Sequence, residues 1–295
     1  DIESNHIDIA KFRYKYTSIF DRLQNVFYKL ILKKNVKKIN MEKYVLAQLE
    51  KLGPQDIILV IRPDCFTKET HLQIKSKTKK YISYIYDSCT RFPIDYLLSE
   101  PIFDRIYSFD KNDCQKFNFS FITNFIYLEK KEVSHINPKD KTIFIILSKD
   151  ERFIFLNKFA NYLSENAIDF RFILMGKRKP KNINPKIIYT KKHIFIDELK
   201  HELENSAVLL DLIRHEHNGL SFRIFEFLAM QKKIITTNQS IKEYDFYNSN
   251  NILVIDEQNI AVSPEFLSTP YEPLSDALYE KYTIKNWVKT IFEID

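Results

Sequence analysis

The sequence predicts an α/β fold made of two Rossmann-like domains, each with a parallel sheet. Short apolar runs typical of buried strands recur about every 20 to 25 residues, with helical or loop stretches between them, as in βαβ units. The series is interrupted once, by the charged, proline-containing segment 129–141 (EKKEVSHINPKDK), which we interpret as a linker. A length of 295 residues is enough for two ordinary domains.

The bulk composition fits a protein with a large core in a reducing compartment. Hydrophobic residues make up 44% of the chain, and the net charge is +6. The excess of Lys either reflects the codon usage of an AT-rich genome or serves to attract anionic ligands or an anionic membrane. Three cysteines, an odd number without metal-ligand spacing, predict a cytoplasmic location. No apolar run approaches the length of about 18 residues that a membrane span needs, and no signal peptide is apparent.

The first half begins with a helical apolar stripe over residues 12–31 that ends in a lysine-rich stretch. A basic amphipathic helix can lie on a membrane surface. The alternative is a helix that packs on the core and exposes its lysines near its C-terminus, where the helix dipole favours cations. Both interpretations stay open at this point.

Three strands are predicted next, over Asp56–Ile61, Tyr81–Tyr86 and Ile106–Phe109. A helix over 41–52 precedes them, and Gly53 before Pro54 is typical of a helix C-cap.

Polar residues follow two of these strands, where ligands bind to open parallel sheets. Asp87 could act as general base towards an acceptor hydroxyl, or cap a following helix. Arg91 could hold an acceptor phosphate or carboxylate, or be an ordinary surface residue. Asp110 follows the third strand in the same way and is a candidate acceptor-binding residue.

The second half repeats the pattern. Strands are predicted over Ile143–Leu147, Phe170–Met175, Ile187–Tyr189, Val208–Ile213, Ile234–Thr237 and Ile252–Ile255. Helical spacing of apolar residues predicts helices over 153–163, 196–203, 220–228 and 279–292.

Glycine is rare in this chain, with 3 in 295 residues, whereas about 7% is typical of proteins. Each glycine therefore indicates a special backbone conformation or a close approach. Gly176 and Gly219 both follow predicted strands. The loop 214–221, between a strand and the N-terminus of a helix, is a typical place for a phosphorylated ligand.

The segment 218–235 (NGLSFRIFEFLAMQKKII) resembles the donor-site motif of GT-B glycosyltransferases. In that motif an acidic residue precedes Gly, and a second Glu, matched here by Glu226, follows eight positions after the first. Asn218 stands where the first Glu is usual, so neither that residue's role nor the retaining mechanism associated with the full motif is carried over. With Arg214 ahead and 244–255 behind, the segment is more specifically similar to transferases that build bacterial lipopolysaccharide and capsule.

The resemblance implies a GT-B-like fold, in which two Rossmann-like domains have parallel sheets facing a cleft. It assigns residues 1–130 to an acceptor-binding domain, 142–278 to a nucleotide-sugar-binding domain and 279–295 to a terminal helix that returns to the first domain. Because the first clear strand comes only near Asp56, the first domain would lack the strand–helix unit with which such domains usually open.

The implied activity is transfer of a sugar from a nucleotide sugar to a lipopolysaccharide or capsule glycan, or a glycolipid, at the inner face of the membrane. Glu226 would hold the ribose hydroxyls, because a carboxylate can accept two hydroxyl hydrogen bonds. The alternative for Glu226 is a helix-surface residue that pairs with Arg223 three positions earlier.

Phosphate binding would fall to cations and backbone N–H groups. The helix start offers N–H groups, and the candidate donor-binding residues are Gly219, Leu220, Ser221, Arg214, Arg223, Lys177 and Gly176. For Lys177, the alternative is an ordinary solvated basic loop (177–181). Such cations would stabilise the leaving nucleotide without a metal, so neither metal nor cofactor is expected.

Other site types lack support in the sequence. His215, Glu216 and His217 have no third zinc ligand at a suitable spacing. No P-loop, nucleophile elbow or dinucleotide fingerprint is present. A catalytically inactive nucleotide-binding or scaffolding module of the same fold is the alternative function, motivated by Asn218. Nucleic acid is not an expected partner, because the basic residues are spread along the chain rather than built into a recognised motif.

Overall fold

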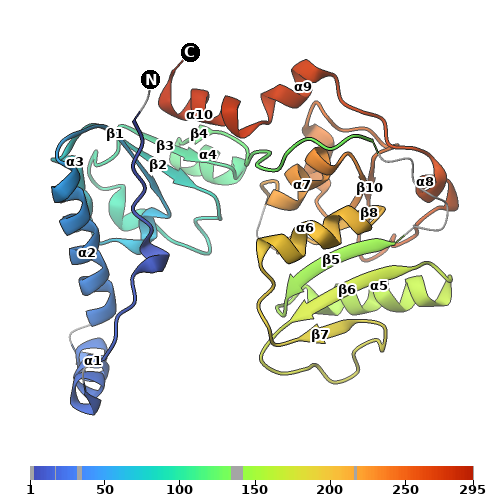
Figure 1. Cartoon of the computed structure of the whole chain (residues 1–295), viewed down its shortest axis with the longest axis horizontal. Coiled ribbons are helices and arrows are strands. Elements are labelled where there is room, and N and C mark those ends of the chain that lie inside the picture. The colour runs from blue at the N-terminus through green and yellow to red at the C-terminus, as the bar shows by residue number, and fades with distance from the viewer. Residues whose placement is uncertain (1–2, 17, 32–34, 134–141, 216–217, 295) are drawn as a thin grey trace. The chain divides into compact units, whose positions relative to one another are not determined.

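The computed structural model describes residues 3–16, 18–31, 35–133, 142–215 and 218–294. The chain divides into two compact units (Figure 1). Unit 1 comprises residues 1–108 and 113–121, and unit 2 comprises 109–112 and 122–295. Each unit contains a parallel sheet flanked by helices, which confirms the predicted fold class. The boundary at residues 121 and 122 comes before the predicted linker 129–141, of which 134–141 lie outside the described residues.

Unit 1 has a four-stranded parallel sheet in the order β1-β2-β3-β4. Its elements in chain order are η1 (Ile9–Lys11), α1 (Ile19–Ile31), α2 (Val36–Leu52), β1 (Gln55–Ile61), η2 (Pro63–Cys65), α3 (Lys68–Lys75), β2 (Thr78–Ile85), η3 (Asp95–Leu97), β3 (Arg105–Ser108), α4 (Lys111–Phe117) and β4 (Ser120–Phe121). The first two residues of α4 are assigned to unit 2.

The core of unit 1 lies between the sheet and helices α2 and α3. Val45 and Leu49 of α2 pack with Tyr81 and Ile85 of β2 in one apolar cluster. Helix α2 ends at Gly53, whose φ of 72° lies in the region that glycine adopts at little cost. The predicted strands and this C-cap are therefore confirmed.

The prediction of one helix over residues 12–31 was wrong in its first third. Helix α1 begins only at Ile19. Phe12, Tyr14 and Tyr16 alternate with the exposed Arg13 and Lys15, which is the two-residue period of an extended chain. The ring of Phe12 lies 5.5 Å from that of Tyr44 on α2. Aromatic packing in an extended conformation thus replaces the expected first helical turns.

Unit 2 has a six-stranded parallel sheet in the order β10-β9-β8-β5-β6-β7. Its elements in chain order are β5 (Ile143–Ser148), α5 (Phe153–Glu165), β6 (Phe170–Met175), β7 (Ile188–Thr190), α6 (Ile196–Asn205), β8 (Val208–Asp211), α7 (Phe222–Met230), β9 (Lys233–Thr236), η4 (Gln239–Glu243), β10 (Ile252–Val254), α8 (Pro264–Ser268), α9 (Asp276–Lys281) and α10 (Ile284–Phe292).

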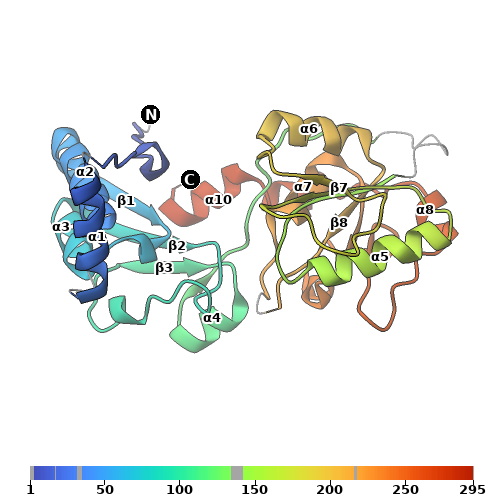
Figure 2. The ribbon, with the colours of Figure 1, turned by 90° about the horizontal axis from the view of Figure 1, so that it is seen from below.

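Helices cover both faces of this sheet, with α5 on one side and α6 on the other (Figure 2). Successive residues of a strand point to opposite faces. Accordingly, Ile143 and Ile145 of β5 join the cluster that contains α5, whereas Phe144 joins the cluster that contains α7. The near-continuous apolar runs in the sequence are therefore the signature of strands that are buried on both faces.

The strand order reverses direction between β5 and β8. From β5 the chain continues through β6 to β7 on one side, and then returns to place β8 on the other side of β5. The pairing of β5 with β8 covers only Ile143 with Val208 and Phe144 with Leu209. Beyond this point the two strands separate towards their carboxyl ends, where the sheet opens.

The predicted helix over 279–292 is interrupted. Tyr282 and Thr283 separate α9 from α10, and the Thr283 side chain accepts a hydrogen bond from the backbone N–H of Asn286, as an N-cap does. A Thr cap inside the apolar pattern accounts for the break. None of the helices in the described part of the chain combines the length and the apolar character that spanning a membrane requires.

Candidate functional site

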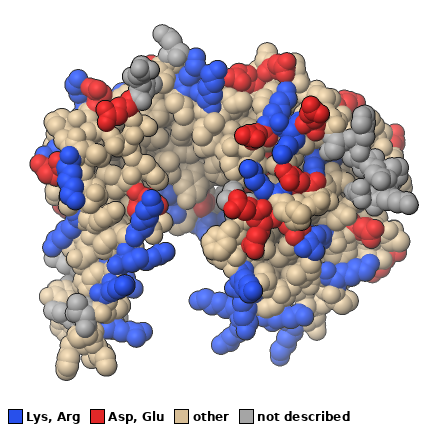
Figure 3. All heavy atoms as spheres, viewed as in Figure 1, with Lys and Arg blue, Asp and Glu red and all other residues tan. Residues whose placement is uncertain are grey.

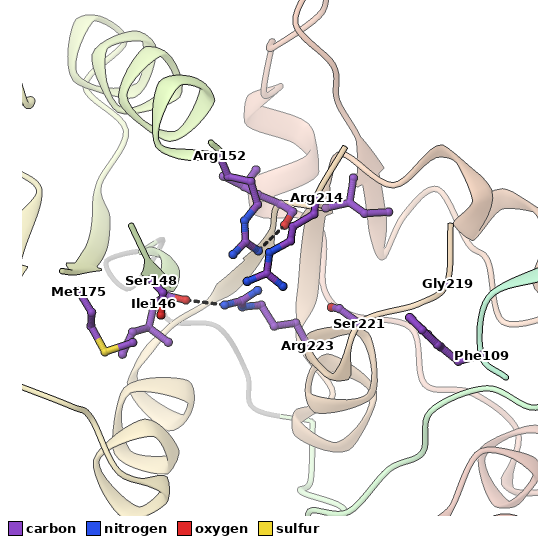
Figure 4. Close-up of a pocket in the computed structure, with 11 residues that line it drawn as sticks. Phe109, Ile146, Ser148, Arg152, Met175, Arg214, Gly219, Ser221 and Arg223 are labelled. Atoms are coloured by element: carbon purple, nitrogen blue, oxygen red, sulfur yellow. Dashed lines mark hydrogen bonds between the residues drawn. The ribbon is translucent and has the colours of Figure 1, made fainter. Parts of the chain in front are cut away.

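A pocket of about 300 Å³ opens in unit 2 at the carboxyl ends of β5, β6 and β8. It faces the first residues of α7. Its described lining includes three arginines and no acidic residue, and Figure 4 shows the three guanidinium groups pointing towards one another. The lining residues are Phe109, Ile146, Ser148, Arg152, Met175, Leu212, Ile213, Arg214, Gly219, Ser221 and Arg223.

The pocket lies where β5 and β8 separate. Ile146 and Ser148 come from the end of β5, and residues 212–214 directly follow β8. Open α/β sheets bind ligands at such a reversal of strand order, because the connections leave the two strands in opposite directions and create a crevice. The strand order alone therefore favours a binding site at this position.

Asp211 connects the elements that form one wall of the pocket. This last residue of β8 is 1% exposed. Its carboxylate accepts hydrogen bonds from the Ser221 hydroxyl at 2.8 Å and from the Thr236 hydroxyl at 2.9 Å. Asp211 thus joins β8, β9 and the N-terminus of α7. Ser221 is the N-cap residue of α7 by its backbone angles, but its side chain bonds Asp211 instead of a backbone N–H. The Ser221 side chain therefore does not cap the N–H groups in the first turn of α7, and such groups suit an anionic ligand.

Arg223 extends from α7 and contacts β5 at the place where β5 and β8 separate. Its Nη2 donates to the carbonyl oxygen of Ile146 at 2.5 Å, and its Nη1 lies 3.8 Å from Asp211. A guanidinium has five N–H donors in a fixed plane. Arg223 is therefore positioned by β5 while it retains donors that can point into the pocket.

Arg152 and Arg214 share the carboxylate of Asp150. Arg152 forms a two-pronged pair with Asp150, with hydrogen bonds of 2.9 and 2.6 Å, and donates to the Leu212 carbonyl at 3.0 Å. The Nε of Arg214 lies 3.3 Å from Asp150. Burial raises the pKa of Asp150, but the hydrogen bonds and charge of Arg152, together with Arg214, outweigh it and hold this pKa below its usual value. Asp150 is thus an anionic anchor that orients two cations.

Gly219 is the close approach that the glycine count predicts. A Cβ atom at this position would lie 2.2 Å from the ring of Phe109 and 2.7 Å from its carbonyl oxygen. The nearby carboxylate of Asp110 accepts a hydrogen bond from the Asn218 N–H at 3.3 Å. Asn218 and Gly219, the first two residues of the donor-motif segment, are therefore packed against residues 109–112, which belong to the same unit.

Glu226 is buried on α7 behind the pocket and does not line it. It is 7% exposed, and its carboxylate accepts a hydrogen bond from the Tyr127 hydroxyl at 2.6 Å. The alternative of a surface Glu is thus wrong. Burial raises its pKa, against the lowering effects of Tyr127 and Arg223. Its assignment to the ribose hydroxyls stays a prediction.

Three other predicted donor residues also lie outside the pocket lining. Leu220 is buried, and its carbonyl accepts a hydrogen bond from Asn124. Gly176 is engaged at the β6–β7 edge, where its carbonyl accepts from the Tyr189 hydroxyl at 2.5 Å. Lys177 is exposed, as its alternative of a solvated loop predicts.

In unit 1, Asp87 and Arg91 form a pair. Nη1 of Arg91 donates to Asp87 at 2.8 Å, and the Ser88 N–H donates to the same carboxylate at 3.1 Å. No helix directly follows Asp87, so its alternative as a helix cap is wrong. Asp110, assigned with these two to the acceptor, is a 1% exposed residue of unit 2 that also accepts from the Asn112 N–H, and its acceptor role stays a prediction.

Sequence reasoning missed Arg62, at the end of β1. Its φ of 65° is unusual for a residue with a side chain. It pairs with Asp64 through two hydrogen bonds of 2.7 Å, and its guanidinium carbon lies 3.5 Å from the centre of the Phe92 ring. The same ring lies 5.0 Å from Arg91, so Phe92 connects Arg62 with the Asp87–Arg91 pair.

The residues missed in unit 2 follow the same rule that identified Arg214. Asp150 and Arg152 come directly after β5, and Asp211 ends β8. The sequence signal that could have identified these residues is their position as polar residues at the ends of predicted strands.

Nothing in the described part of the chain brings three His, Cys, Asp or Glu side chains together as a metal site would. His215 is exposed, and His217 lies outside the described residues. The expected absence of a metal stays a prediction.

Comparison with solved structures finds similar folds at low sequence identity. TarM matches with a TM-score of 0.57 and 12% identity over 86% of this chain and 58% of its own. OtsA matches with a TM-score of 0.57 and 11% identity over 87% of this chain and 76% of its own. The N-terminal domain of Candida albicans trehalose-6-phosphate phosphatase matches with a TM-score of 0.52 and 11% identity over 87% and 73%. This chain thus spans less than two thirds of the length of TarM.

No protein-family model matches the sequence, and no curated protein matches it either. The likeness to TarM and OtsA, which are GT-B glycosyltransferases, is therefore a likeness of fold. Two parallel-sheet α/β units, with the donor-motif segment in the second, give this chain a GT-B-like fold.

Proposed function

We propose that this protein is a glycosyltransferase that uses a nucleotide-sugar donor. The observation that carries the proposal is the arginine-lined pocket of unit 2, which lies at the reversal of strand order and against the start of α7. A nucleotide sugar carries one or two phosphates, and guanidinium groups together with helix N–H groups are the donors that suit them. The GT-B-like fold supports the same assignment.

The three arginines have different roles in this proposal. Arg223 and Arg214 contact the phosphates, because each is partly exposed in the pocket, with 24% and 29% of the side chain accessible. Arg152, at 11%, is already committed to Asp150 and the Leu212 carbonyl, and through the shared Asp150 it positions Arg214. Glu226 binds the ribose only after the Tyr127 hydroxyl releases its carboxylate.

In the proposed transfer, the bond between the sugar's anomeric carbon and the phosphate oxygen breaks as an acceptor oxygen bonds to that carbon. The nucleotide leaves with the electron pair, and Arg214 and Arg223 stabilise its negative charge. A general base takes the proton of the acceptor hydroxyl. Asp87 is our candidate for that base, Arg91 and Asp110 are our candidates for acceptor binding, and no metal is required.

The acceptor class rests on the segment 208–256, which is similar to transferases of lipopolysaccharide and capsule synthesis. We therefore propose a bacterial glycan or glycolipid acceptor in the cytoplasm. OtsA, whose fold is similar at 11% identity, is a trehalose-6-phosphate synthase.

The first test is a thermal-shift panel of nucleotides and nucleotide sugars on the wild type, Arg223→Gln and, as a control, Lys191→Gln, an exposed residue outside the pocket. We expect one nucleotide class to raise the midpoint of the wild type and the control by mass action. The rise should shrink in Arg223→Gln, because a donor to the phosphates is lost. No stabilisation of the wild type by any nucleotide at saturating concentration contradicts the donor site.

Assays of donor hydrolysis and of transfer to glycan acceptors then distinguish a glycosyltransferase from the alternative, an inactive nucleotide-binding module. Turnover that Arg223→Gln and Asp87→Asn reduce supports the transferase. Nucleotide binding without hydrolysis or transfer indicates the inactive nucleotide-binding module.

A further inference from the structure

Helix α1 presents a continuous apolar face to solvent. Its exposed fractions are 78% for Ile19, 82% for Phe20, 59% for Leu23, 49% for Val26 and 55% for Phe27. These positions recur every three or four residues and therefore share one side of the helix. Isolated exposed apolar residues are ordinary, but a contiguous group of this kind indicates an interaction surface.

A different side of α1 attaches the helix to unit 1. Asn25 is 2% exposed. Its side chain donates to the Tyr16 hydroxyl at 2.6 Å and accepts from the backbone N–H of Val36, the first residue of α2, at 3.1 Å. These bonds turn the side of the helix that carries Asn25 inward, so the apolar side stays outward.

The surroundings of this face are strongly basic. Lys11, Arg13, Lys15, Arg22 and Lys37 are exposed. Within residues 9–43 the only acidic residues are Asp21 and Glu42, and the carboxylate of Glu42 bonds the Thr67 N–H. The basic residues of this stretch are Lys11, Arg13, Lys15, Arg22, Lys29, Lys33, Lys34, Lys37, Lys38 and Lys43. In Figure 3 this part of unit 1 has an uncharged tip, with blue side chains above it.

We propose that α1 is a membrane-binding element that inserts its apolar face into the surface of an anionic lipid bilayer. Apolar side chains enter the acyl boundary while Lys and Arg contact the lipid phosphates, which is the chemistry of interfacial helices. At 13 residues the helix is about 20 Å long, too short to span a bilayer but suited to lying flat on it.

Charge also decides between a lipid surface and a second copy of this chain. A second copy would bring an equally basic segment to the interface, and like charges repel at such a contact. An anionic bilayer offers opposite charge around an apolar interior, and so satisfies both parts of the surface.

The test is co-sedimentation with vesicles of phosphatidylcholine, with and without phosphatidylglycerol, at low and high salt. The apolar variant is Phe20→Ser with Phe27→Ser, and the charge variant is Arg13→Gln with Lys15→Gln. Ile154→Ser, which removes a 76% exposed apolar side chain from α5 in unit 2, is the matched control. All four side chains of the two test variants are exposed or half-exposed, so these proteins keep their core.

We expect the wild type and Ile154→Ser to bind the anionic vesicles and to dissociate as salt rises. The apolar variant should lose at least about tenfold in affinity, since two aromatic rings no longer enter the bilayer. The charge variant should bind more weakly, with a shallower dependence on salt.

A Phe20→Trp variant checks insertion directly, because its emission should shift to the blue on anionic vesicles. Absence of vesicle binding, or binding that both test variants retain, overturns the proposal. A wild-type dimer in sedimentation velocity that Phe20→Ser with Phe27→Ser dissociates would assign the face to a second copy instead. None of these readouts involves glycosyl transfer, so the inference stands or falls separately from the proposed function.

Discussion

At the scale of single residues, a buried ionisable side chain in each unit makes the stability of that unit depend on pH. In unit 1, His71 is fully buried, and its ring nitrogens lie 2.8 Å from the Tyr81 hydroxyl and 2.9 Å from the Pro63 carbonyl. A neutral ring satisfies both partners if Nε2–H donates to Pro63 and Nδ1 accepts from Tyr81. Burial lowers the pKa of His71 to about 4, so the folded protein keeps this ring neutral well below the usual titration of histidine.

Replacement of His71 should therefore change the acid sensitivity of unit 1. As pH falls from 6.5 to 4, the unfolded chain gains a proton that the folded ring does not accept, so this group lowers the free energy of unfolding by up to about 3 kcal/mol. His71→Gln removes the titration while keeping one donor and one acceptor. Urea unfolding at a series of pH values should show a smaller loss for His71→Gln than for the wild type. The exposed control His193→Gln should follow the wild type, and an unchanged loss in His71→Gln would contradict the assignment.

In unit 2, Glu226→Gln tests a buried carboxyl group whose pKa is raised by burial. Because the folded state disfavours the ionised form, the carboxylate lowers stability as pH rises above its unfolded pKa, whereas Gln stays neutral. We expect Glu226→Gln to melt at or above the wild-type midpoint near neutral pH, with the difference narrowing in acid.

The nucleotide response separates this effect from ligand binding. A carboxylate offers two acceptor oxygens to a ribose diol and an amide only one, so the thermal shift by nucleotide should fall in Glu226→Gln. Glu257→Gln, an exposed position in the same unit, serves as control. A marked drop in midpoint without nucleotide would show that the charged form stabilises the fold.

At the scale of elements, the side chain of one lysine, Lys232, bonds the backbone carbonyl groups between the end of α6 and the start of β8. The Nζ of Lys232 donates to the carbonyls of Leu203, Glu204 and Ser206, the first two at 2.5 and 2.6 Å. The last carbonyls of a helix have no partner within it, and here a side chain from the turn between α7 and β9 supplies one. Burial lowers the pKa of Lys232 to about 8, which leaves the amine largely charged at neutral pH.

We expect Lys232→Met to destabilise unit 2 by about 2 to 4 kcal/mol, because buried carbonyl groups lose their donor. Thermal and urea unfolding measure the loss. Lys200→Met removes an exposed lysine of α6 and should cost less than about 0.5 kcal/mol. Equal effects of the two substitutions would mean that the Lys232 bonds contribute little.

At the scale of the whole molecule, all described residues that line the pocket belong to unit 2. Hydrogen exchange should therefore slow on nucleotide binding in the segments 146–152 and 212–224, since ligand binding suppresses local opening around its site. Protection confined to residues 55–108 would place the nucleotide in unit 1 instead. Exchange of the same segments in Arg223→Gln, with and without nucleotide, provides the control.

The sequence was sufficient for the sheet scaffold and for some of the residues that line the pocket. Strand β6 matches its prediction over Phe170–Met175, because a continuous apolar run between polar residues has few other interpretations. Of the loop after β8, which was predicted to bind a phosphorylated ligand, Arg214, Gly219 and Ser221 line the pocket, and ligand binding there stays a prediction. The first prediction depends on the local apolar pattern, and the second on the rule that ligands bind at the carboxyl ends of parallel strands.

What could not be predicted depends on contacts between distant residues. Phe109 lies against Gly219, and Tyr127 bonds Glu226, across separations that periodicity does not encode. Residues 12–16 satisfy a helical stripe and an extended alternation equally well, and the packing of Phe12 on Tyr44 decides between them.

The short pairing between β5 and β8 has a mechanical consequence. Only two residue pairs join the half-sheet β5-β6-β7 to the half-sheet β8-β9-β10, whereas β5 and β6 share six. Under a pulling force the sheet of unit 2 would part along this seam first. Three side chains already bridge this line: Arg223 bonds the Ile146 carbonyl, Arg152 bonds the Leu212 carbonyl and Arg214 bonds Asp150. An anion bound in the pocket would add a further contact across this line, so ligand binding would strengthen the place where the sheet has the fewest paired residues.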